Sequence, residues 1–326
     1  MNVLLWQEQR TARIRTYQNA HLIYNPNAGR LRRHPKLMDA VITRLRNAGH
    51  CVSPRPTAGP GDATQIARQC VEEGADLILV AGGDGTINEA ANGMVHSNTP
   101  LSVIPAGTAN VLAMEMRMGA NAAKVAARLG EFEPARIGVG LLCDPGGAPR
   151  RHFLLMAGAG LDAHIVANLN LSLKRMLGKG AYWTAGFSSL LRRLEELEVR
   201  NGTHHVRCSF ALASRVRNYG GDLEIALGAG LLRKHFEVVM FEGSNPFRYL
   251  KYFAGVLAGA TSKLSGVTVL HPTHLIMAPS GNASVHVQVD GEDGGLLPAE
   301  LRFVPDALTL LMPPEFLASE RTRWTT

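Results

Sequence analysis

One stretch of the chain, Leu79 to Met94 (LVAGGDGTINEAANGM), constrains the fold more than any other. The apolar run Leu77 to Ala81 ends at two glycines. An aspartate, a third glycine and a threonine follow, and apolar residues then recur at helical spacing. This order of strand, glycine turn and helix is typical of α/β sheets, which bind ligands at the carboxyl ends of their strands. Gly82, Gly83 and Gly85 would let a ligand approach the main chain, and the N–H groups that open the helix would face a phosphate.

The same letters also fit a simpler interpretation, in which the glycines form a tight turn and Asp84 caps the following helix. If the loop binds phosphate, the Asp84 carboxylate is a hard oxygen ligand suited to Mg²⁺. The two interpretations differ in whether other polar loops gather beside this one.

Four further motifs follow expected strands along the chain. They are YNPNAG (24–29), TAGPGDA (57–63), PAGTAN (105–110) and VDGE (289–292). Together with GGDGT, and in this order, they resemble the catalytic domain shared by diacylglycerol kinases, sphingosine kinases and related bacterial lipid kinases. GGDGT alone also occurs in NAD kinases, so the ordered set, which spans most of residues 20–310, carries the resemblance.

The resemblance implies an ATP-dependent lipid kinase that uses Mg²⁺ and transfers the γ-phosphate to a lipid hydroxyl. It implies that the nucleotide is bound by residues of the loops and of the helix after GGDGT: Asn25, Asn27, Gly29, Arg30, Thr57, Gly82, Gly83, Asp84, Gly85, Thr86, Asn88, Glu89, Gly107, Thr108 and Asn110. Asp84 is the expected metal ligand. Taken singly, the polar residues of these loops are more typical of turns and caps, and only their clustering after strand ends favours a binding role.

The two expected catalytic residues are Asp290 and Glu292. Asp290 follows an apolar strand, so it can be held rigidly, and a carboxylate within reach of a hydroxyl can take its proton as the phosphoryl group arrives. Glu292 fills the last place of the Asp-Gly-Glu motif and is the second candidate for a catalytic residue. The alternative for Asp290 is an ordinary Asp-Gly turn that leaves a strand.

Strands and helices alternate in the first half and strands dominate the second. Expected strands are 22–24, 51–57, 77–81, 101–104, 136–143, 153–157, 206–213, 223–227, 236–241, 267–270, 274–278 and 285–289. The alternation predicts an α/β domain with a mostly parallel sheet, of the NAD-kinase/phosphofructokinase-like kind that the resemblance implies. Two helical stretches, 172–198 and 246–259, interrupt the later strands, whose apolar–polar alternation predicts a β-rich antiparallel domain.

The expected domain boundaries follow from these patterns. Residues 1–18 form an N-terminal extension, 19–145 the nucleotide-binding domain and 146–306 the β-rich domain that binds the lipid acceptor. Residues 144–150 read as a turn or short linker near the boundary. The resemblance implies that the end of the chain returns to the first domain, so we expect 307–320 to complete it, with 307–312 as the returning strand.

Composition limits the partners. The net charge of +7 suits an anionic ligand or an anionic membrane surface. It would also suit nucleic acid, but no nucleic-acid fold signature occurs, so none is expected as a partner. The four cysteines are scattered without metal-ligand spacing, which favours a cytoplasmic protein. No segment reaches the ~20 apolar residues of a spanning helix, so we expect peripheral membrane contact.

The lipid acceptor is harder to infer. Residues 173–193 and 247–257 combine apolar, aromatic and basic residues, a mixture typical of helices at a membrane interface. The alternative is two ordinary helices packed on a sheet. Diacylglycerol, phosphatidylglycerol, a sphingoid base and a polyprenol all satisfy the pattern, and a homodimer is left open.

Two departures from the family pattern keep other functions open. Many members have an aspartate after GTxN, whereas Val111 stands here. In the segment 224–239, Lys234-His235 replaces the usual Asp-Gly turn. A kinase for a soluble acceptor such as NAD, and a catalytically silent nucleotide- or lipid-binding protein, therefore remain as alternatives to the lipid kinase.

Overall fold

The structure is a computed structural model and describes residues 14–161, 194–202, 204–219 and 223–325. The basic and aromatic stretch 173–193 lies outside these residues. The helix expected at 172–198 falls mostly outside them as well, and its last two residues belong to a strand, β8 (Leu197–Asn201).

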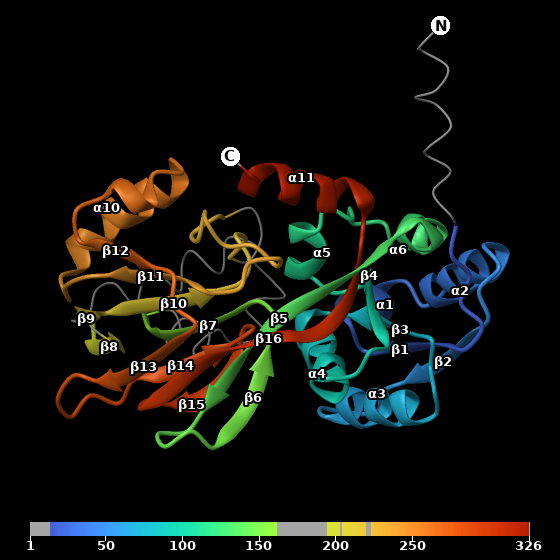
Figure 1. The fold of residues 1–326 in the computed structure, drawn as a ribbon, viewed down its shortest axis with the longest axis horizontal. Coiled ribbons are helices and arrows are strands. Elements are labelled where there is room, and N and C mark those ends of the chain that lie inside the picture. The colour runs from blue at the N-terminus through green and yellow to red at the C-terminus, as the bar shows by residue number, and fades with distance from the viewer. Residues whose placement is uncertain (1–13, 162–193, 203, 220–222, 326) are drawn as a thin grey trace, which may run out of the picture.

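The first half is built on four parallel strands. They are β1 (Ala20–Tyr24), β2 (Val52–Pro56), β3 (Leu77–Gly82) and β4 (Pro100–Pro105), in the order β2-β1-β3-β4. The central strands β1 and β3 are apolar runs that are buried on both faces, as a covered parallel sheet requires. Helices α3 (Asp62–Glu72) and α4 (Asp84–Met94) cover one face (Figure 1). On the other face lie α2 (Leu37–Asn47), α5 (Val111–Glu115) and α6 (Ala122–Ala127).

One long strand, β16 (Ala299–Met312), carries this sheet into the second half of the molecule. Its end pairs in parallel with β4, Thr309 opposite Pro100, and most of its length pairs antiparallel with β5 (Glu133–Cys143). The sheet then continues through β13 (His274–Pro279), β8 and β9 (His204–Cys208). Residues 144–150, expected as a turn or linker, include the hairpin turn between β5 and β6 (Pro149–Phe153).

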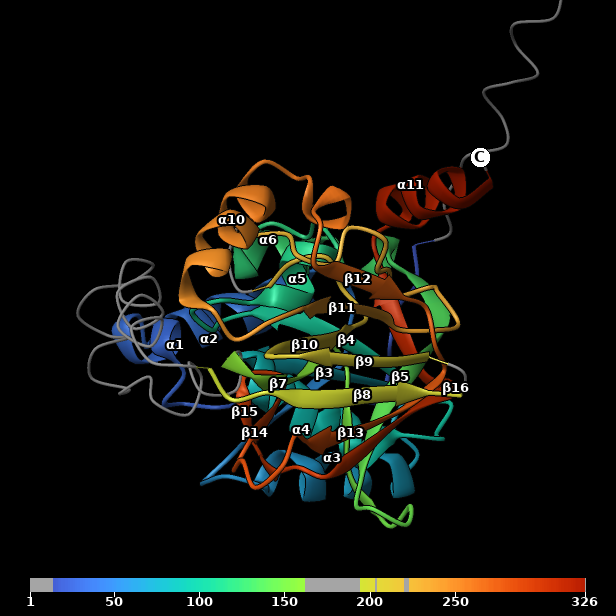
Figure 2. The same ribbon diagram turned by 90° about the vertical axis from the view of Figure 1, so that its left-hand side faces the viewer.

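A second sheet makes up the rest of the β-rich half. Its order is β12 (Val267–Leu270), β11 (Glu237–Phe241), β10 (Phe210–Ser214), β7 (Met156–Gly160), β14 (His286–Val289) and β15 (Glu292–Leu296), all antiparallel (Figure 2). An apolar core lies between the two sheets. The predicted fold class, an α/β domain with parallel strands followed by an antiparallel β-rich part, is confirmed.

Several strands differ from the expectation, and β15 and residues 299–306 of β16 were not expected as strands. The strand expected at 153–157 is two strands, β6 and β7, because the N–H groups of Leu154 and Leu155 bind a side chain instead of a neighbouring strand. The strand expected at 206–213 divides at Ser209 between the two sheets. The segment 223–227 is not a strand: it forms the single bridge Asn218–Glu224, and the Ile225 N–H binds Arg217 O.

The described part of the second half also contains two α-helices. The first, α10 (Pro246–Leu257), packs Tyr249 and Tyr252 against Phe241 and leaves Arg248 and Lys251 exposed. The second, α11 (Pro314–Thr325), follows β16 and lies along the top of the molecule where the two halves meet (Figure 1).

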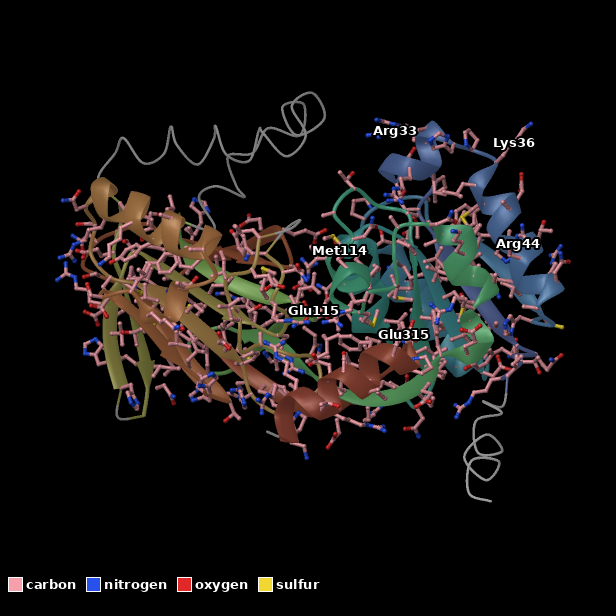
Figure 3. All side chains as sticks on the ribbon, turned by 90° about the horizontal axis from the view of Figure 1, so that it is seen from above. Arg33, Lys36, Arg44, Met114, Glu115 and Glu315 are labelled. Atoms are coloured by element: carbon pink, nitrogen blue, oxygen red, sulfur yellow. The ribbon has the colours of Figure 1, made fainter. Side chains whose placement is uncertain are left out.

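A buried glutamate joins the two halves. Glu115 lies on α5, and Figure 3 shows it at the boundary between the halves. Its carboxylate accepts hydrogen bonds from the N–H and Nε of Arg217 (3.0 and 3.1 Å) and from Nδ2 of Asn218 (2.9 Å). Because a buried carboxylate is stable only when it is paired in this way, the contact fixes α5 against the segment after β10.

Candidate active site

The glycine-rich loops meet at the carboxyl ends of the parallel strands. The Asn25 N–H binds Ala81 O (3.2 Å), which holds the loop after β1 against β3. The Arg30 N–H binds Ala106 O (3.2 Å) at the opening of the loop after β4. A Cβ placed on Gly29 would lie 3.0 Å from Thr108 Oγ1, so the NPNAG and PAGTAN loops are in contact. Three of the sequence motifs therefore form one surface.

Packing requires two glycines of this surface and leaves a third open. A Cβ on Gly107 would lie 2.5 Å from Gly83 Cα, and one on Gly82 would lie 2.7 Å from Thr86 Cβ. A Cβ on Gly83 would meet only Gly107 Cα, at 3.9 Å, and the backbone there (φ −84°, ψ 175°) suits any residue. Neither the space at its Cβ nor its backbone conformation demands glycine at Gly83.

Several polar residues of the loops shape the turns. Asn25 Oδ1 accepts the N–H of Asn27 (2.9 Å), and Asn110 closes on Gly107 through both its Oδ1 (2.8 Å) and its Nδ2 (3.0 Å). Asn110 also has a positive φ of 52°, a conformation that asparagine tolerates better than most residues. The Thr57 N–H binds Tyr24 O (2.9 Å) and places the end of β2 beside the loop after β1.

Asp84 links two loops of the site. Its Oδ1 accepts the Leu112 N–H (3.2 Å) at the start of α5, directly after the position where Val111 replaces the family's aspartate. Val111 itself is buried. The Asp84 carboxylate is a hard oxygen ligand of the kind that Mg²⁺ requires.

Asn88 and Glu89 make contacts elsewhere on α4. Asn88 is buried and accepts from Nδ2 of Asn92 (3.3 Å), while the main-chain oxygen of Glu89 accepts from Thr64 Oγ1 (2.7 Å). Asn92 in turn exchanges hydrogen bonds with the main chain of His152 on β6 (2.9 and 3.0 Å). This part of α4 therefore braces the loop helix against the second half of the molecule.

The Asp-Gly-Glu motif of the second half reaches the GGDGT loop. A Cβ on Gly85 would lie 2.3 Å from Glu292 Oε1, so the carboxylate is against the loop backbone. The other oxygen, Oε2, pairs with Arg151 Nη2 at 2.5 Å. A cation and an anion from the second half thus lie beside the loop on which a phosphate would sit.

Asp290 is buried and held by the main chain. Its Oδ1 accepts the N–H groups of Leu155 and Met156, its Oδ2 accepts that of Leu154, and all three bonds are 2.9 Å. These bonds use both lone pairs of Oδ1 and one of Oδ2, so Oδ2 keeps one acceptor position. Its positive φ of 51° is that of a turn, so Asp290 leaves β14 as an Asp-Gly turn and is also a fixed carboxylate.

The environment of Asp290 shifts its ionisation toward neutral pH. Burial raises the pKa of Asp290 to about 6, while the three N–H bonds and the charge of Arg151 act in the opposite direction. A base is most effective when its pKa lies near the working pH. The site therefore contains a carboxylate that is largely ionised at pH 7 and can still accept a proton.

The sequence analysis missed Arg151 and Asn92. Arg151 stands beside another arginine in PRRHF, a pattern that reads as a solvated strand end, and its partner Glu292 is far away in sequence. Asn92 sits on the polar side of a helical pattern and gives no signal of its contact with His152. Only the pairing of the two halves identifies either residue.

Comparison with known proteins assigns the family. A model of the diacylglycerol kinase catalytic domain matches residues 19–141, and a model of the YegS C-terminal NAD kinase beta sandwich-like domain matches 156–312. A diacylglycerol kinase of Bacillus subtilis is 30% identical over 311 residues, covering 91% of this chain and 97% of the relative. The chain belongs to the diacylglycerol kinase family. It is a kinase, as the motifs implied.

Other relatives agree with this assignment. A diacylglycerol kinase of Mycobacterium tuberculosis is 28% identical over 312 residues, covering 88% of this chain and 99% of the relative. A solved diacylglycerol kinase structure from Bacillus anthracis str. Sterne has a TM-score of 0.69 at 17% identity, covering 92% and 98% of the two chains. A second solved chain from that strain reaches a TM-score of 0.77 at 19% identity, covering 95% and 99%. At these identities the structures establish the shared fold.

Proposed function

We propose that the protein is an ATP-dependent lipid kinase that transfers the γ-phosphoryl group to the hydroxyl of diacylglycerol or a related lipid. The observation that carries the proposal is the contact between the halves, in which Glu292 meets Gly85 and Asp290 is fixed just upstream. The glycine loops would bind the donor, and the Asp-Gly-Glu motif would face the acceptor. Phosphoryl transfer needs this arrangement of positioned phosphates and an oriented hydroxyl.

The loops would hold the triphosphate of ATP. The open space at Gly83 leaves its N–H and those opening α4 accessible to phosphate oxygens, which the positive end of the helix dipole also favours. Asp84 would hold Mg²⁺, directly or through water. When bound, the ion neutralises the charge of the transferred group.

Asp290 would act as the general base. Its free Oδ2 position can accept the proton of the lipid hydroxyl while the three N–H bonds hold the carboxylate still. Arg151 and Glu292 would place one positive and one negative charge between this base and the glycine loop. The chain would thus supply orientation, a proton acceptor and charge balance.

We further propose that the protein acts in the cytoplasm and approaches lipid as a peripheral protein. Among the described residues, no helix is both long and apolar enough to cross a bilayer. The exposed Arg248 and Lys251 on α10, the excess of positive charge and the basic stretch 173–193 support contact with an anionic surface. Each basic residue near such a surface adds about 1 kcal/mol at low salt.

One assay tests the function. Radiolabelled ATP is offered with diacylglycerol, phosphatidylglycerol, a sphingoid base or a polyprenol in anionic vesicles, over a salt series, and with NAD in solution. We expect label in a lipid product and a rate that falls as salt weakens vesicle binding. Label in NAD would favour the kinase for a soluble acceptor. The family model that matches residues 156–312 is described as NAD kinase beta sandwich-like, which is why NAD is included in the assay. No transfer to any acceptor, despite ATP binding, would favour the silent protein.

The ion pair between Arg151 and Glu292 yields a prediction for ATP affinity. In Arg151→Met, the Glu292 carboxylate stays against Gly85 without its cation and repels the phosphates. We expect the KM for ATP to rise roughly tenfold, the scale of a partly screened charge interaction of ~1–2 kcal/mol. Adding Glu292→Gln removes the repelling charge, so the double variant should recover most of the ATP affinity although its turnover stays low.

Arg150→Met is the matched control. Arg150 precedes Arg151 but pairs with Asp144 at the β5–β6 hairpin turn, so its loss should leave the KM for ATP unchanged. An equal rise in the KM of both single variants, or no recovery in the double variant, would show that Arg151 does not act through Glu292.

A further inference from the structure

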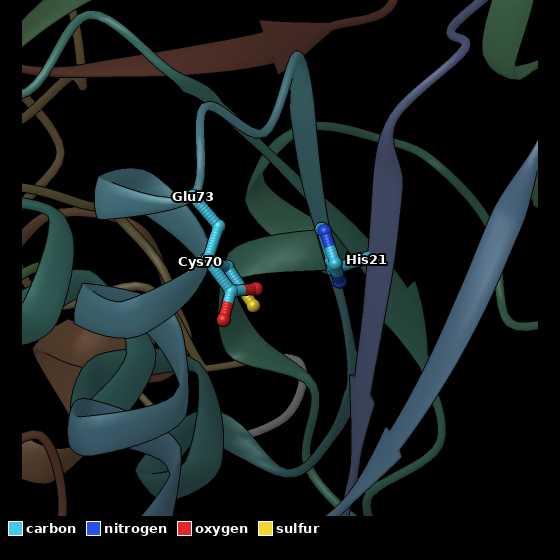
Figure 4. A group of neighbouring side chains, drawn as sticks. All are labelled: His21, Cys70 and Glu73. Carbon is cyan, nitrogen blue, oxygen red and sulfur yellow. The ribbon is translucent and has the colours of Figure 1, made fainter.

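A second cluster of reactive side chains lies at the other end of β1, under α3. It contains His21 of β1, Cys70 of α3 and Glu73, the residue directly after α3 (Figure 4). One ligand atom from each residue lies within 4.8 Å of the other two. His21 and Cys70 are 5% and 1% exposed, whereas Glu73 opens to solvent, so the cluster is buried on one side and accessible on the other. Glu73 caps the C-terminal end of α3 and follows Cys70 by three positions, about one helical turn.

His21 has an unsatisfied ring nitrogen in this cluster. Its Nδ1 accepts a hydrogen bond from Arg55 Nε (3.3 Å), which leaves the ring proton on Nε2. Nε2 is buried and has no hydrogen-bond partner. A buried polar atom without a partner destabilises the fold by about 1–3 kcal/mol, so a ligand that satisfies this ring would be bound favourably.

The ionisation state of His21 suits a metal ion, whereas Cys70 must lose its proton to bind one. Burial, reinforced by Arg55, lowers the pKa of His21, so its imidazole is neutral at physiological pH, the form that binds metals. Burial raises the pKa of the Cys70 thiol. Binding would then form a sulfur–metal bond and release the thiol proton to solvent.

We propose that His21, Cys70 and Glu73 form a zinc site that is separate from the kinase active site. Imidazole, thiolate and carboxylate are the side chains that Zn²⁺ takes as ligands, and three of them with one open position make a four-coordinate site. The thiolate disfavours Mg²⁺ and Ca²⁺, which prefer oxygen ligands. The open position faces solvent on the side of Glu73.

Arg55 competes with the ion for this site. Its Nη2 pairs with Glu73 Oε2 at 3.2 Å while its Nε holds His21 Nδ1. Zinc binding moves the ring proton from Nε2 to Nδ1, frees the Nε2 lone pair for the metal and displaces the half-exposed Arg55 side chain into water. The cluster would therefore exchange an arginine for a metal ion.

The site would stabilise the helix layer that supports the nucleotide loop. The bound ion would join β1 to the last turn of α3. That helix packs closely on α4, because a Cβ on Gly93 would lie 2.2 Å from Thr64 O and because Thr64 Oγ1 binds the Glu89 oxygen. Since zinc would bind the folded state through residues from two elements, it should raise the melting temperature.

The test uses cobalt as a spectroscopic probe and zinc as the competitor, with the full-length protein. Co²⁺ bound to Cys70 should give a thiolate charge-transfer band at one equivalent, and Zn²⁺ should abolish the band. Titration of that band gives the affinity, and thermal unfolding with and without zinc gives the stabilisation. Neither readout depends on kinase activity.

Each variant has a matched control. Cys70→Ala should lose the band and Glu73→Gln should bind at least roughly tenfold more weakly, the lower end of effects measured around metal sites. Cys51→Ala removes the exposed cysteine and should change nothing, and the neighbouring exposed Glu72→Gln should also be silent. Arg55→Gln should bind zinc more tightly than wild type, because it removes the competing cation.

The proposal is overturned if the band is lost in Cys51→Ala, which would place the metal at the exposed cysteine, or if wild type shows no band and no zinc-dependent rise in melting temperature. If Cys70→Ala fails to fold, the zinc affinities of Glu73→Gln and Glu72→Gln are compared instead. Equal affinities in these two variants would overturn the proposal. Equal zinc affinity in Arg55→Gln and wild type would exclude the exchange mechanism.

Discussion

Replacing Asp290 by asparagine is expected to lower turnover by roughly 10²- to 10⁴-fold, the scale of general-base catalysis. The amide cannot take the proton of the acceptor hydroxyl, whereas the glycine loops that we propose to bind ATP are not altered. ATP affinity should therefore change little. The measurement is kcat with the preferred lipid, beside a binding titration with ATP.

The pH dependence of turnover gives a second signature of Asp290. With a pKa raised by burial to about 6, the carboxylate is ionised above that pH and protonated below it. A base acts only when ionised, so turnover should fall tenfold for each pH unit below about 6 in the wild type. In Asp290→Asn this acid limb should disappear from the low residual rate.

The same shift predicts the effect of pH on stability. The pKa of Asp290 is about 6 in the folded protein and near the ordinary 3.8 when unfolded, so the folded state holds the proton more tightly. The stabilisation from Asp290 is thus fully present below pH 3.8 and is lost as the pH rises through about 6. Thermal unfolding over this window should be less pH-dependent in Asp290→Asn.

Asp293→Asn is the control for Asp290→Asn. Asp293 is exposed on β15, just after the turn, and its Oδ1 accepts the Gly295 N–H (3.0 Å), so its loss should leave turnover intact. In Asp290→Asn the NH₂ group of the new side chain can face the Leu154 N–H, so that two donors oppose each other and the fold is destabilised. The melting temperature must therefore be measured for both variants. Near-normal turnover in a folded Asp290→Asn protein would reduce Asp290 to a turn residue that holds β6 and β7.

The nucleotide half could be predicted because its signals are local. An apolar run such as 77–81 predicts a buried strand, the glycines that follow predict a turn, and the spacing of Ile87, Ala90 and Ala91 predicts a helix. The loops come together as a consequence of parallel pairing, which brings all carboxyl ends to one edge. Motif order and strand alternation were therefore sufficient to predict the fold class.

The second half was harder because long-range contacts set its strands. The run 153–157 is continuous in the sequence, but Asp290 takes the N–H groups of Leu154 and Leu155 and divides it. Arg215, fully buried, donates to the carbonyls of Leu231, Arg233 and His235, so that segment folds around a guanidinium. No periodicity within either segment reveals such a partner.

The residues of the candidate site also fall into two groups, those that the sequence reveals and those that only the structure reveals. The glycines and Asp84 were found from motifs, whereas Arg151 becomes visible only through its bond to Glu292. Structure also gives Asn25 and Asn110 turn-forming roles that the sequence left open. A residue whose role depends on a neighbour in the other half cannot be found from its own surroundings in the chain.

Gly83→Val should abolish detectable ATP binding at ordinary nucleotide concentrations while the protein stays folded. The backbone angles at Gly83 suit valine, and its Cβ would meet nothing closer than Gly107 Cα at 3.9 Å, so we expect the free protein to fold. The branched side chain would occupy the space through which phosphate reaches the N–H groups of the loop. Each hydrogen bond to a charged group contributes about 1.5–3 kcal/mol, so losing two weakens binding roughly 10²-fold or more.

The neighbouring glycines separate this effect from misfolding. Gly107→Val would place a Cβ 2.5 Å from Gly83 Cα, so it should lower the melting temperature as well as ATP affinity. Gly83→Val should lower ATP affinity alone, and Gly83→Ala, with its smaller side chain, should fall between Gly83→Val and wild type. Calorimetric titration with ATP and thermal unfolding of all three variants give the comparison. Unchanged ATP affinity in a folded Gly83→Val protein would show that the GGDGT loop is not part of the phosphate site. Since neither packing nor conformation requires glycine at that position, its presence would then have no physical explanation.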